Sequence, residues 1–441
     1  MFTDREIHAT TPARTVALDS LEAGIEAAHP RRVIADAVSL DGDTLTVANV
    51  TYDLTAFDDV VVLGGGNAAA HVAAALETAL GNRLSGGVVV TDDPAETDRV
   101  TVHRGDHPVP SERGVEGATA VMVAAERADE RTLVLAVITG GASALLPAPV
   151  DAISLDDLQA TTNALLESGA TIHEINAVRK HLSALKGGQL ARLAAPATVV
   201  GLVLSDVVGN DLSVIGSGPT VPDDSTYEDA LSVLSQYDVP VPNAVSAHLE
   251  RGASGDLQET PRADDPIFDR VTTHILADNF TALDAAREVA KEQGYDPLVL
   301  SSSVRGEARE AAKSHVAVAE EVLATGNPLD APCVLLAGGE CTVTVRGDGE
   351  GGPSQEFCVS AALELRDERI TVAAVDSDGI DGATDVAGAL VDTETFDDRT
   401  AASTALREND VYPLLAAAGA HLHTGATGTN VNDLRIVVVD A

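Results

Sequence analysis

The sequence contains no tryptophan, few aromatic residues and little positive charge. Aromatic side chains make up 2% of its 441 residues, so the core must be built from Val, Leu, Ile and Ala. Lys and Arg together number 28 against 69 Asp and Glu, which gives a formal net charge of −41. Binding to a nucleic-acid backbone requires clustered cations. The composition therefore excludes nucleic-acid binding as a main function.

Cysteines and long apolar runs are also scarce. Cys333, Cys341 and Cys358 are the three cysteines, and no pair has C-x-x-C spacing. This argues against both a disulfide framework and a zinc site, so we expect three reduced core residues. No stretch reaches ~18 uninterrupted apolar residues, and the first residues contain no long apolar run. We expect no membrane span, no signal peptide and a cytoplasmic location.

The acidic residues are spread along the whole chain and do not form a single tail. With 45% hydrophobic residues, the chain has enough apolar surface to fold despite its charge. One interpretation is adaptation to a cytoplasm of molar salt, where the Debye length falls to ~3 Å and self-repulsion is screened. The alternative is an acidic protein of an ordinary habitat.

The length exceeds the roughly 250–300 residues that one core serves, so two domains are expected. Apolar runs rich in Val and Leu alternate with Ala/Leu-rich helical segments, a pattern that favours a parallel sheet covered on both faces. We predict a Rossmann-like α/β domain over 1–245 and a smaller α/β domain over 265–441, joined by the weakly periodic segment 239–265. The second domain is expected to contain strands near 271–276, 297–300, 333–336, 342–345, 371–375 and 436–439, with helices near 307–324 and 355–365.

The first glycine-rich corner follows an apolar run and consists of Gly64, Gly65 and Gly66, with Asn67 next. It satisfies the loose pattern G-x-G-x-x-A, in which glycines let backbone N–H groups approach an anion. Asp92, after the next strand, could then bind a ribose. This keeps an NAD(P)-dependent oxidoreductase open as a function. A tight turn with close packing explains the corner equally well.

A second corner repeats this arrangement with hydroxyl groups added. Gly140, Gly141 and Ser143 follow the apolar run 133–138, and a further loop contains Ser217 and Gly218. Ligands of open α/β sheets bind at the carboxyl ends of the strands. We therefore predict a phosphate-binding role for these residues, with ordinary turn chemistry as the alternative.

Two of the four lysines lie in the segment 174–190. Arg179 and Lys186 are seven residues apart, which is two turns if a single helix continues, so they would share a face with Lys180 nearby. In a chain with so little lysine, this concentration predicts an anion clamp. Surface salt bridges on a solvated helix are the alternative.

Two aspartates follow another buried apolar run. Asp206 and Asp211 lie beside glycine-rich turns, where carboxylates suit Mg²⁺ or a general base. Local hydrogen bonding within turns is the alternative. In the second half, Gly/Asp/Thr loops at 337–340, 349–356, 376–382 and 424–433 are expected to form the facing wall of a cleft between the domains.

In combination, these motifs resemble those of the glycerate 2-kinases, also described as hydroxypyruvate reductase-like proteins, over nearly the whole chain. The matching segments are HPVP at 107–110, TGGASALL at 139–146, SGATIHEINAVRKHLSALKGGQLA at 168–191, SDVVGND at 205–211, GSGPTVPD at 216–223, GGE at 338–340, SDGIDG at 377–382 and TGTNVND at 427–433. The resemblance implies ATP-dependent phosphorylation of D-glycerate to 2-phosphoglycerate, dependence on Mg²⁺, a C-terminal MOFRL-type domain and an active cleft between two α/β domains.

The resemblance also assigns roles to individual residues. Asp206 is expected to act as the base or as an Mg²⁺-linked acid, and Arg179, Lys180 and Lys186 as phosphate-side cations. The family usually has Lys where this chain has Asn67, and Arg where it has Pro353. A neighbouring cation therefore substitutes for them, or the chain has shifted substrate or become a catalytically silent paralogue. Glycerate and ATP are the expected partners, and a homodimer is left open.

Overall fold

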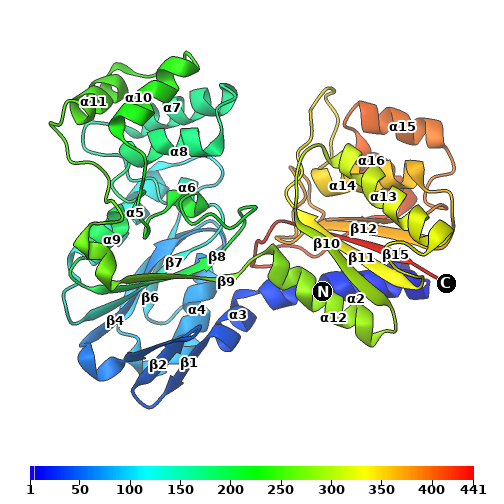
Figure 1. The fold of residues 1–441 in the computed structure, drawn as a ribbon, viewed down its shortest axis with the longest axis horizontal. Coiled ribbons are helices and arrows are strands. Elements are labelled where there is room, and N and C mark those ends of the chain that lie inside the picture. Colours follow the sequence, from blue (N-terminus) through cyan, green and yellow to red (C-terminus); the bar gives the residue numbers. More distant parts are fainter. Residues whose placement is uncertain (4) are drawn as a thin grey trace. The chain divides into compact units, whose positions relative to one another are not determined.

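The computed structural model describes residues 1–3 and 5–441, which form two compact units (Figure 1). The central unit spans Val33–Leu276, and the terminal unit combines Met1–Arg32 with Ala277–Ala441. The expected boundaries differ, because they assigned the first 32 residues to the N-terminal domain. Helix α2 (Pro12–Ala28) instead buries Val16, Leu21 and Ile25 in the core of the terminal unit.

The sheet of the central unit has the order β6-β5-β4-β7-β8-β9. Neighbouring strands from β6 to β8 are parallel, and every residue of β7 is buried, as the unbroken apolar runs predict. The strands are β4 (Asp59–Gly65), β5 (Gly86–Thr91), β6 (Val100–Arg104), β7 (Thr132–Ile138), β8 (Thr198–Leu204) and β9 (Val271–Ala277). Helices α5 (Glu112–Glu126) and α9 (Gln189–Ala194) share a core with this sheet, and α4 (Ala69–Leu80) contacts β4, β5 and β7.

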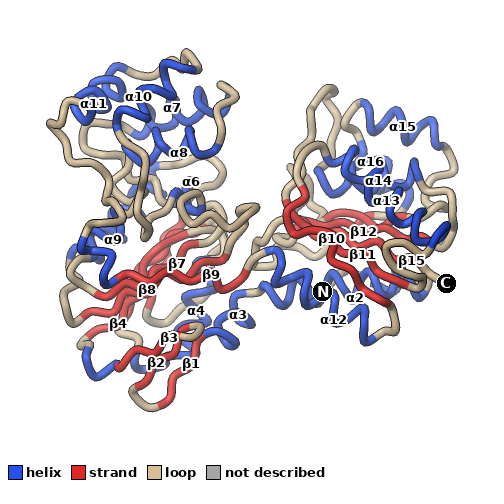
Figure 2. The backbone as a smooth tube through the Cα atoms, in the orientation of Figure 1, coloured by secondary structure: helices blue, strands red, loops and turns tan. Residues whose placement is uncertain are grey.

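Two further substructures belong to the central unit (Figure 2). One is a small antiparallel sheet of β1 (Val38–Asp41), β2 (Thr44–Val47) and β3 (Val50–Asp53). The other is a helical cluster of α7 (Leu155–Glu167), α8 (Ile172–His181), α10 (Tyr227–Gln236) and α11 (Asn243–Ala253) around a common apolar core. Helix α11 lies inside the segment 239–265, so much of the expected connection is part of a packed unit.

The terminal unit contains a mixed sheet in the order β10-β11-β15-β12-β13-β14. The strands are β10 (Asp296–Val304), β11 (Cys333–Gly339), β12 (Ile370–Asp376), β13 (Gly388–Val391), β14 (His421–Leu422) and β15 (Asp433–Val439). β10 and β11 are parallel, whereas β15 runs antiparallel to both of its neighbours. Helices α2 and α12 (Asn279–Glu292) share one apolar core with the sheet.

A second core of the terminal unit contains residues of α13 (Ala308–Thr325), α14 (Pro353–Glu364), α15 (Arg399–Arg407) and α16 (Val411–Ala418). The remaining short elements are α1 (Arg5–His8), α3 (Pro30–Ala37), α6 (Ala142–Leu145) and 3-10 turns at Leu54–Ala56, Gly81–Arg83, Ile215–Ser217 and Pro266–Arg270. None of the helices over the described residues is both long and apolar enough to cross a membrane.

The two helices predicted near 307–324 and 355–365 and the strand predicted near 271–276 are confirmed, but the domain assigned to that strand and one other strand prediction were wrong. The segment near 271–276, assigned to the second set, forms the edge strand β9 of the first sheet. The segment 342–345 alternates Thr and Val as a strand would, yet only Thr342 forms a bridge, to Glu307. β11 has already ended at Gly339, so this segment lies beyond the sheet.

Candidate active site

The segment Thr139–Leu146, here called the central loop, connects most of the predicted site residues. It follows the carboxyl end of β7 and contains the one-turn helix α6. Asp206 and Asn67 contact it near Gly141, Ser217 contacts it at Ser143, and Lys186 contacts it at Leu146. The structure therefore brings together motifs that are far apart in the sequence.

The first glycine corner is bonded to the central loop through its own amides. The N–H of Asn67 donates to the carbonyl of Gly140 at 2.8 Å, and the N–H of Gly66 donates to that of Val90 at 3.0 Å. The N–H of Ala68 donates to Thr139 Oγ1 at 3.2 Å. A side chain at Gly64 would clash with the carbonyl oxygen of Val137. Gly64, Gly65 and Gly66 thus allow close strand packing and leave few N–H groups for the predicted phosphate.

The second corner does not present the N-terminus of a long helix to the phosphate predicted there. Helix α6 has only four residues, too few for a substantial dipole, and Gly141 precedes it with φ of +74°. The N–H of Gly141 donates to the carboxylate of Asp206. The packing is so close that a Cβ on Gly140 would lie 2.5 Å from Asp206 Oδ2. The glycines of this corner therefore seat a catalytic candidate.

Asp206 is placed just beyond the end of β8 and is largely surrounded by protein. Burial raises the pKa of its carboxyl to about 6, although hydrogen bonds from the amides of Asp206 and Gly141 act in the opposite direction. A carboxyl with this pKa is ionised at neutral pH but still basic enough to accept a proton from a reacting hydroxyl. The role of Asp206 as a base stays a prediction, and this pKa suits it.

Asn67 occupies the other side of Gly141. Its Nδ2 donates to Asp92 Oδ2 at 3.2 Å, and its buried Oδ1 has no hydrogen-bond partner in the described part of the chain. His107 also packs near Gly141. Burial lowers the pKa of His107, with the charge of Asp92 raising it in part. This group carries a carboxylate and a predominantly neutral imidazole, so it supplies no fixed positive charge.

Arg179 and Lys186 approach each other, but not along one helix. Helix α8 ends at His181, and Lys186 lies in the turn after it, so the predicted shared helical face was wrong. Lys186 is buried and donates from Nζ to the carbonyl of Leu146 at 3.1 Å. Burial and then the charge of Arg179 lower its pKa to about 7. Tertiary contacts, and not helical spacing, bring the two cations together.

Lys180 differs from its neighbours. Its Nζ lies 3.0 Å from Asp223 Oδ1, and the two side chains are 7% and 1% exposed. Asp223 also accepts hydrogen bonds from Ser225 and Thr260. The ammonium group of Lys180 is thus neutralised inside the protein, so its predicted role as a phosphate-side cation is not supported.

One residue of the site was missed by the sequence reasoning. Asn176 on α8 accepts a hydrogen bond from Ser217 Oγ at 3.1 Å, and Ser217 Oγ lies 3.3 Å from Ser143 Oγ. Ser217 has φ of +62°, unusual for a residue other than glycine. Gly218, next to it, accepts from the amide of Gly188. A signal was available, because Asn176 precedes Arg179 by three residues on the predicted helix.

Asp211, which is predicted to bind a metal together with Asp206, takes part in local contacts. Asp211 accepts a hydrogen bond from the amide of Ser213 at 2.8 Å and lies 3.9 Å from His173. Burial tends to raise the pKa of Asp211, but hydrogen bonds from Ser213 and nearby positive charges outweigh it and lower that pKa. Among residues 1–3 and 5–441, no three His, Cys, Asp or Glu side chains are arranged to hold a metal ion.

The glycine and aspartate motifs of the terminal unit also converge, at one edge of its sheet. Asp376 at the end of β12 lies opposite Asp433 at the start of β15. Burial and then the neighbouring carboxylates Asp378 and Asp433 raise the pKa of Asp376. Fully buried Arg435 donates to Asp433 and lies over the ring of Phe357. This edge concentrates carboxylates that favour the protonated form.

Comparisons with known proteins give a consistent result. Residues 16–250 match a family model described as a domain of unknown function (DUF4147), and residues 333–433 match the MOFRL family. A glycerate 2-kinase of Pyrococcus horikoshii is 38% identical over 97% of both chains. The chain belongs to the glycerate 2-kinase family.

Other members of the glycerate 2-kinase family agree in structure and vary in name. The crystal structure of a glycerate kinase from Thermotoga maritima superimposes with a TM-score of 0.84 at 37% identity, covering 96% of this chain and 99% of that one. A protein of Agrobacterium vitis named putative hydroxypyruvate reductase is 39% identical over 86% of this chain and 87% of its own. The family match therefore extends over both units.

Within this glycerate 2-kinase fold, the two positions where a cation was expected have the following local surroundings. Asn67 is bonded to Asp92, as described. Pro353 is the first residue of α14, where its missing N–H costs nothing. The carboxylate of Asp381 accepts from the amides of Ser354 and Gln355 at 2.9 Å and so caps that helix. Both uncharged residues therefore fit their local structure: Asn67 through its hydrogen bond to Asp92 and Pro353 through its place at the start of α14.

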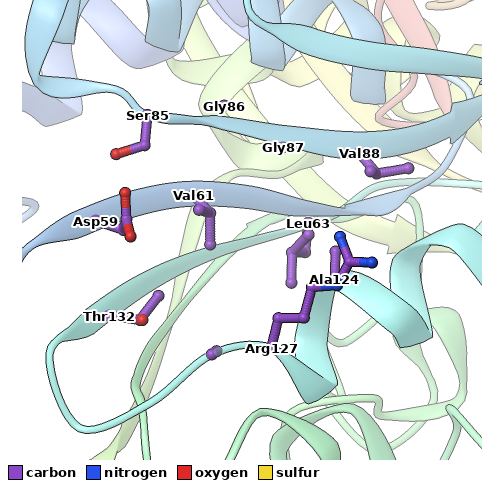
Figure 3. A pocket seen from close by; sticks show the side chains of 11 residues that line it. Asp59, Val61, Leu63, Ser85, Gly86, Gly87, Val88, Ala124, Arg127 and Thr132 are labelled. Atoms are coloured by element: carbon purple, nitrogen blue, oxygen red, sulfur yellow. The ribbon is translucent and has the colours of Figure 1, made fainter.

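A cavity of about 320 Å³ lies elsewhere in the central unit (Figure 3). It is floored by Val61 and Leu63 of β4 and bordered by Gly86 and Gly87 of β5 and by Arg127. Its lining includes none of the predicted site residues. This cavity is therefore separate from the residues of the central-loop cluster.

Proposed function

We propose that this chain is a glycerate 2-kinase that transfers a phosphoryl group from ATP to D-glycerate, giving 2-phosphoglycerate. Family membership supports the reaction class. The observation that carries the proposal is the arrangement on the central loop, where Asp206 contacts Gly140 and Gly141 while Lys186, with Arg179 nearby, contacts Leu146. A base and two cations around one short loop fit phosphoryl transfer, which depends on positioning and charge neutralisation.

In this proposal Asp206 accepts the proton of the attacking hydroxyl group. Arg179 and Lys186 supply positive charge to the substrate carboxylate and to the phosphoryl group. Lys180 serves the fold through Asp223. The chain thus retains two of its three predicted cations for catalysis.

Mg²⁺ is the implied metal, and the donor chemistry of Asp206 fits it. Mg²⁺ in phosphoryl-transfer sites is usually held by one or two carboxylates together with phosphate oxygens. Asp206 is the carboxylate of the central-loop cluster and would hold Mg²⁺ only as the alternative to its role as the base, because one carboxylate does not bind the metal and accept the hydroxyl proton at once. When bound, Mg²⁺ neutralises charge on the phosphates.

Hydroxypyruvate reduction is the second candidate, favoured by the name of the Agrobacterium vitis relative. The glycine corner at residues 64–66 would then bind a dinucleotide phosphate. Its amides are largely engaged by Gly140, Val90 and Thr139, which weakens this candidate. Following NAD(P)H absorbance with hydroxypyruvate tests it directly.

A coupled assay with ATP, Mg²⁺ and D-glycerate at high KCl tests the kinase. Asp206→Asn should lower kcat by about 10²–10⁴-fold if Asp206 is the general base. Asp211→Asn, a matched carboxylate outside the cluster, should change kcat by only a few-fold. Absence of turnover by the wild type, with ATP binding intact, would overturn the kinase proposal.

The chain has Asn67 and Pro353 where the family usually has Lys and Arg. These two differences motivate a third candidate, a catalytically silent paralogue. The double variant Asn67→Lys with Pro353→Arg restores both expected cations. If the wild type is a kinase, the double variant should change its rate without creating a new activity. Turnover that appears only in the double variant would establish that the wild type is silent. Cytoplasmic location and a homodimer stay predictions from the sequence.

A further inference from the structure

Asn176 is a buried amide that is only half satisfied. Its side chain is 3% exposed, and Oδ1 accepts a hydrogen bond from Ser217 Oγ at 3.1 Å. Nδ2 is buried and has no partner among the described residues. Leaving such a donor unpaired costs about 1–3 kcal/mol. An unpaired donor of this kind, next to reactive side chains, indicates a place for an external acceptor.

Arg179 provides a second unpaired donor beside the first. It follows Asn176 by three residues on α8, so the two side chains share one face. Burial lowers the pKa of Arg179, and no acceptor for its guanidinium is found in the part of the chain that the structure describes. The chain has 69 Asp and Glu residues, so a carboxylate partner for a buried cation is easily available within the protein. Lys180, the adjacent residue, is paired in this way with Asp223.

The hydroxyl groups of Ser217 and Ser143 connect this donor pair to the central loop. Ser217 Oγ lies 3.3 Å from Ser143 Oγ, and Ser143 is two residues after Gly141, whose amide binds Asp206. Two residues correspond to roughly 3 Å along a helix axis. The donors and the proposed base are therefore fixed to neighbouring points of one short backbone segment.

We propose that Asn176 and Arg179 bind the carboxylate of the hydroxy acid substrate, with Ser217 and Ser143 holding the amide of Asn176 in position. This deepens the proposed kinase function and rests on it. A guanidinium with a neighbouring N–H donor matches the planar, two-oxygen shape of a carboxylate. Lys186, contacting the other end of the central loop, is then left for the phosphoryl group.

The decisive variant is Asn176→Asp, which keeps the size of the side chain but replaces the donor by a negative charge. The KM for D-glycerate should rise by about 10–100-fold, the range expected when a hydrogen bond to a charged group is lost. The KM for ATP and kcat should change by only a few-fold. Asn163→Asp, on an exposed position of α7, adds the same charge elsewhere on the central unit and should leave both constants unchanged.

Binding measurements separate this proposal from its alternatives. Calorimetric titration of wild type and Asn176→Asp should show weaker D-glycerate binding and unchanged ATP binding. Weakened ATP binding with unchanged D-glycerate binding would overturn the proposal, because the donors would then serve phosphate. Equal binding of both ligands by both proteins would overturn it as well.

The remaining outcomes distinguish a failure of the proposed carboxylate site from a failure of the proposed kinase function. An active wild type with an unaffected Asn176→Asp variant refutes the carboxylate site and leaves the kinase intact, whereas an inactive wild type refutes the kinase. Thermal melts report whether the variant is folded. If Asn176→Asp does not fold, Asn176→Ser removes the same donor without adding charge, and its KM for D-glycerate decides in the same way.

Discussion

Replacing Asp206 by Asn should stabilise the protein while removing its activity. The native pKa of Asp206 is raised from 3.8 to about 6 by burial. A carboxyl with a raised native pKa binds its proton more tightly in the folded state. Stability is therefore lost as pH rises from the unfolded pKa through the native one. At pH 8 the ionised carboxylate costs about 3 kcal/mol of folding free energy, and at pH 5 about half of that.

Asparagine removes this cost, and its Oδ1 can still accept the hydrogen bond from Gly141. For a unit of this size, the gain at pH 8 corresponds to a rise in melting temperature of roughly 5–10 °C. Calorimetric melts of wild type and Asp206→Asn between pH 8 and pH 5 measure it, and the difference should shrink as pH falls.

Asp211→Asn is the matched control, and its expected effect on folding stability is not stabilising. The native environment lowers the pKa of Asp211, so its ionised form is favoured in the folded state and the substitution should not stabilise. A melting temperature of Asp206→Asn no higher than that of the wild type at pH 8 would contradict the prediction. A difference in melting temperature between the two proteins that is independent of pH would contradict it as well.

Three further results are expected. First, kcat/KM should rise as Asp206 loses its proton near pH 6 and fall above about pH 7 as Lys186 loses its own, and Lys186→Arg should remove the alkaline decline in the measured pH profile. Second, Lys180→Met leaves Asp223 buried without its partner and should lower the unfolding free energy by about 3–5 kcal/mol in urea titrations, with KM values unchanged in whatever protein remains folded. Third, Gly64→Ala should destabilise by at least 1–3 kcal/mol, because its Cβ would meet the Val137 carbonyl and its φ of +141° is nearly restricted to glycine, whereas Gly42→Ala, with open space and a φ of +59° in the left-handed region, should cost about 1 kcal/mol.

Local sequence pattern was sufficient for the parallel strands of the central unit. β4, β7 and β8 are buried on both faces, so their unbroken apolar runs carry the prediction by themselves. Local sequence pattern was insufficient to assign β9 to the correct sheet, because the pattern of a strand does not record which sheet the strand joins. The destination of α2 likewise depends on a surface formed by residues from the other end of the chain.

The candidate site shows the same division. The sequence identified Asp206 and the basic segment, but Arg179 and Lys180 are adjacent and look alike in a sequence. Only the fold shows that Lys180 is paired with Asp223 while Arg179 is not. The glycine corners also look alike, and their different uses depend on hydrogen bonds between distant strands. The three-residue spacing from Arg179 could have drawn attention to Asn176, but only the structure shows that its Nδ2 is buried and lacks a hydrogen-bond partner among the described residues.

The terminal unit combines two segments that are far apart in the sequence, and this affects how it folds during synthesis. All of the central unit leaves the ribosome before residue 277, so it can fold while translation continues. The sheet of the terminal unit is incomplete until its inner strand β15, near the last residue, has emerged, which takes roughly 10–30 s more at bacterial and eukaryotic elongation rates. Helix α12 follows soon after residue 277 and covers part of α2, because Ala282, Leu283 and Ala286 belong to the same apolar core. The side of α2 that packs against β12 and β15 stays uncovered until β15 has been made. The nascent chain therefore holds a helix pair whose sheet-facing apolar surface is exposed to chaperones and to aggregation during that interval.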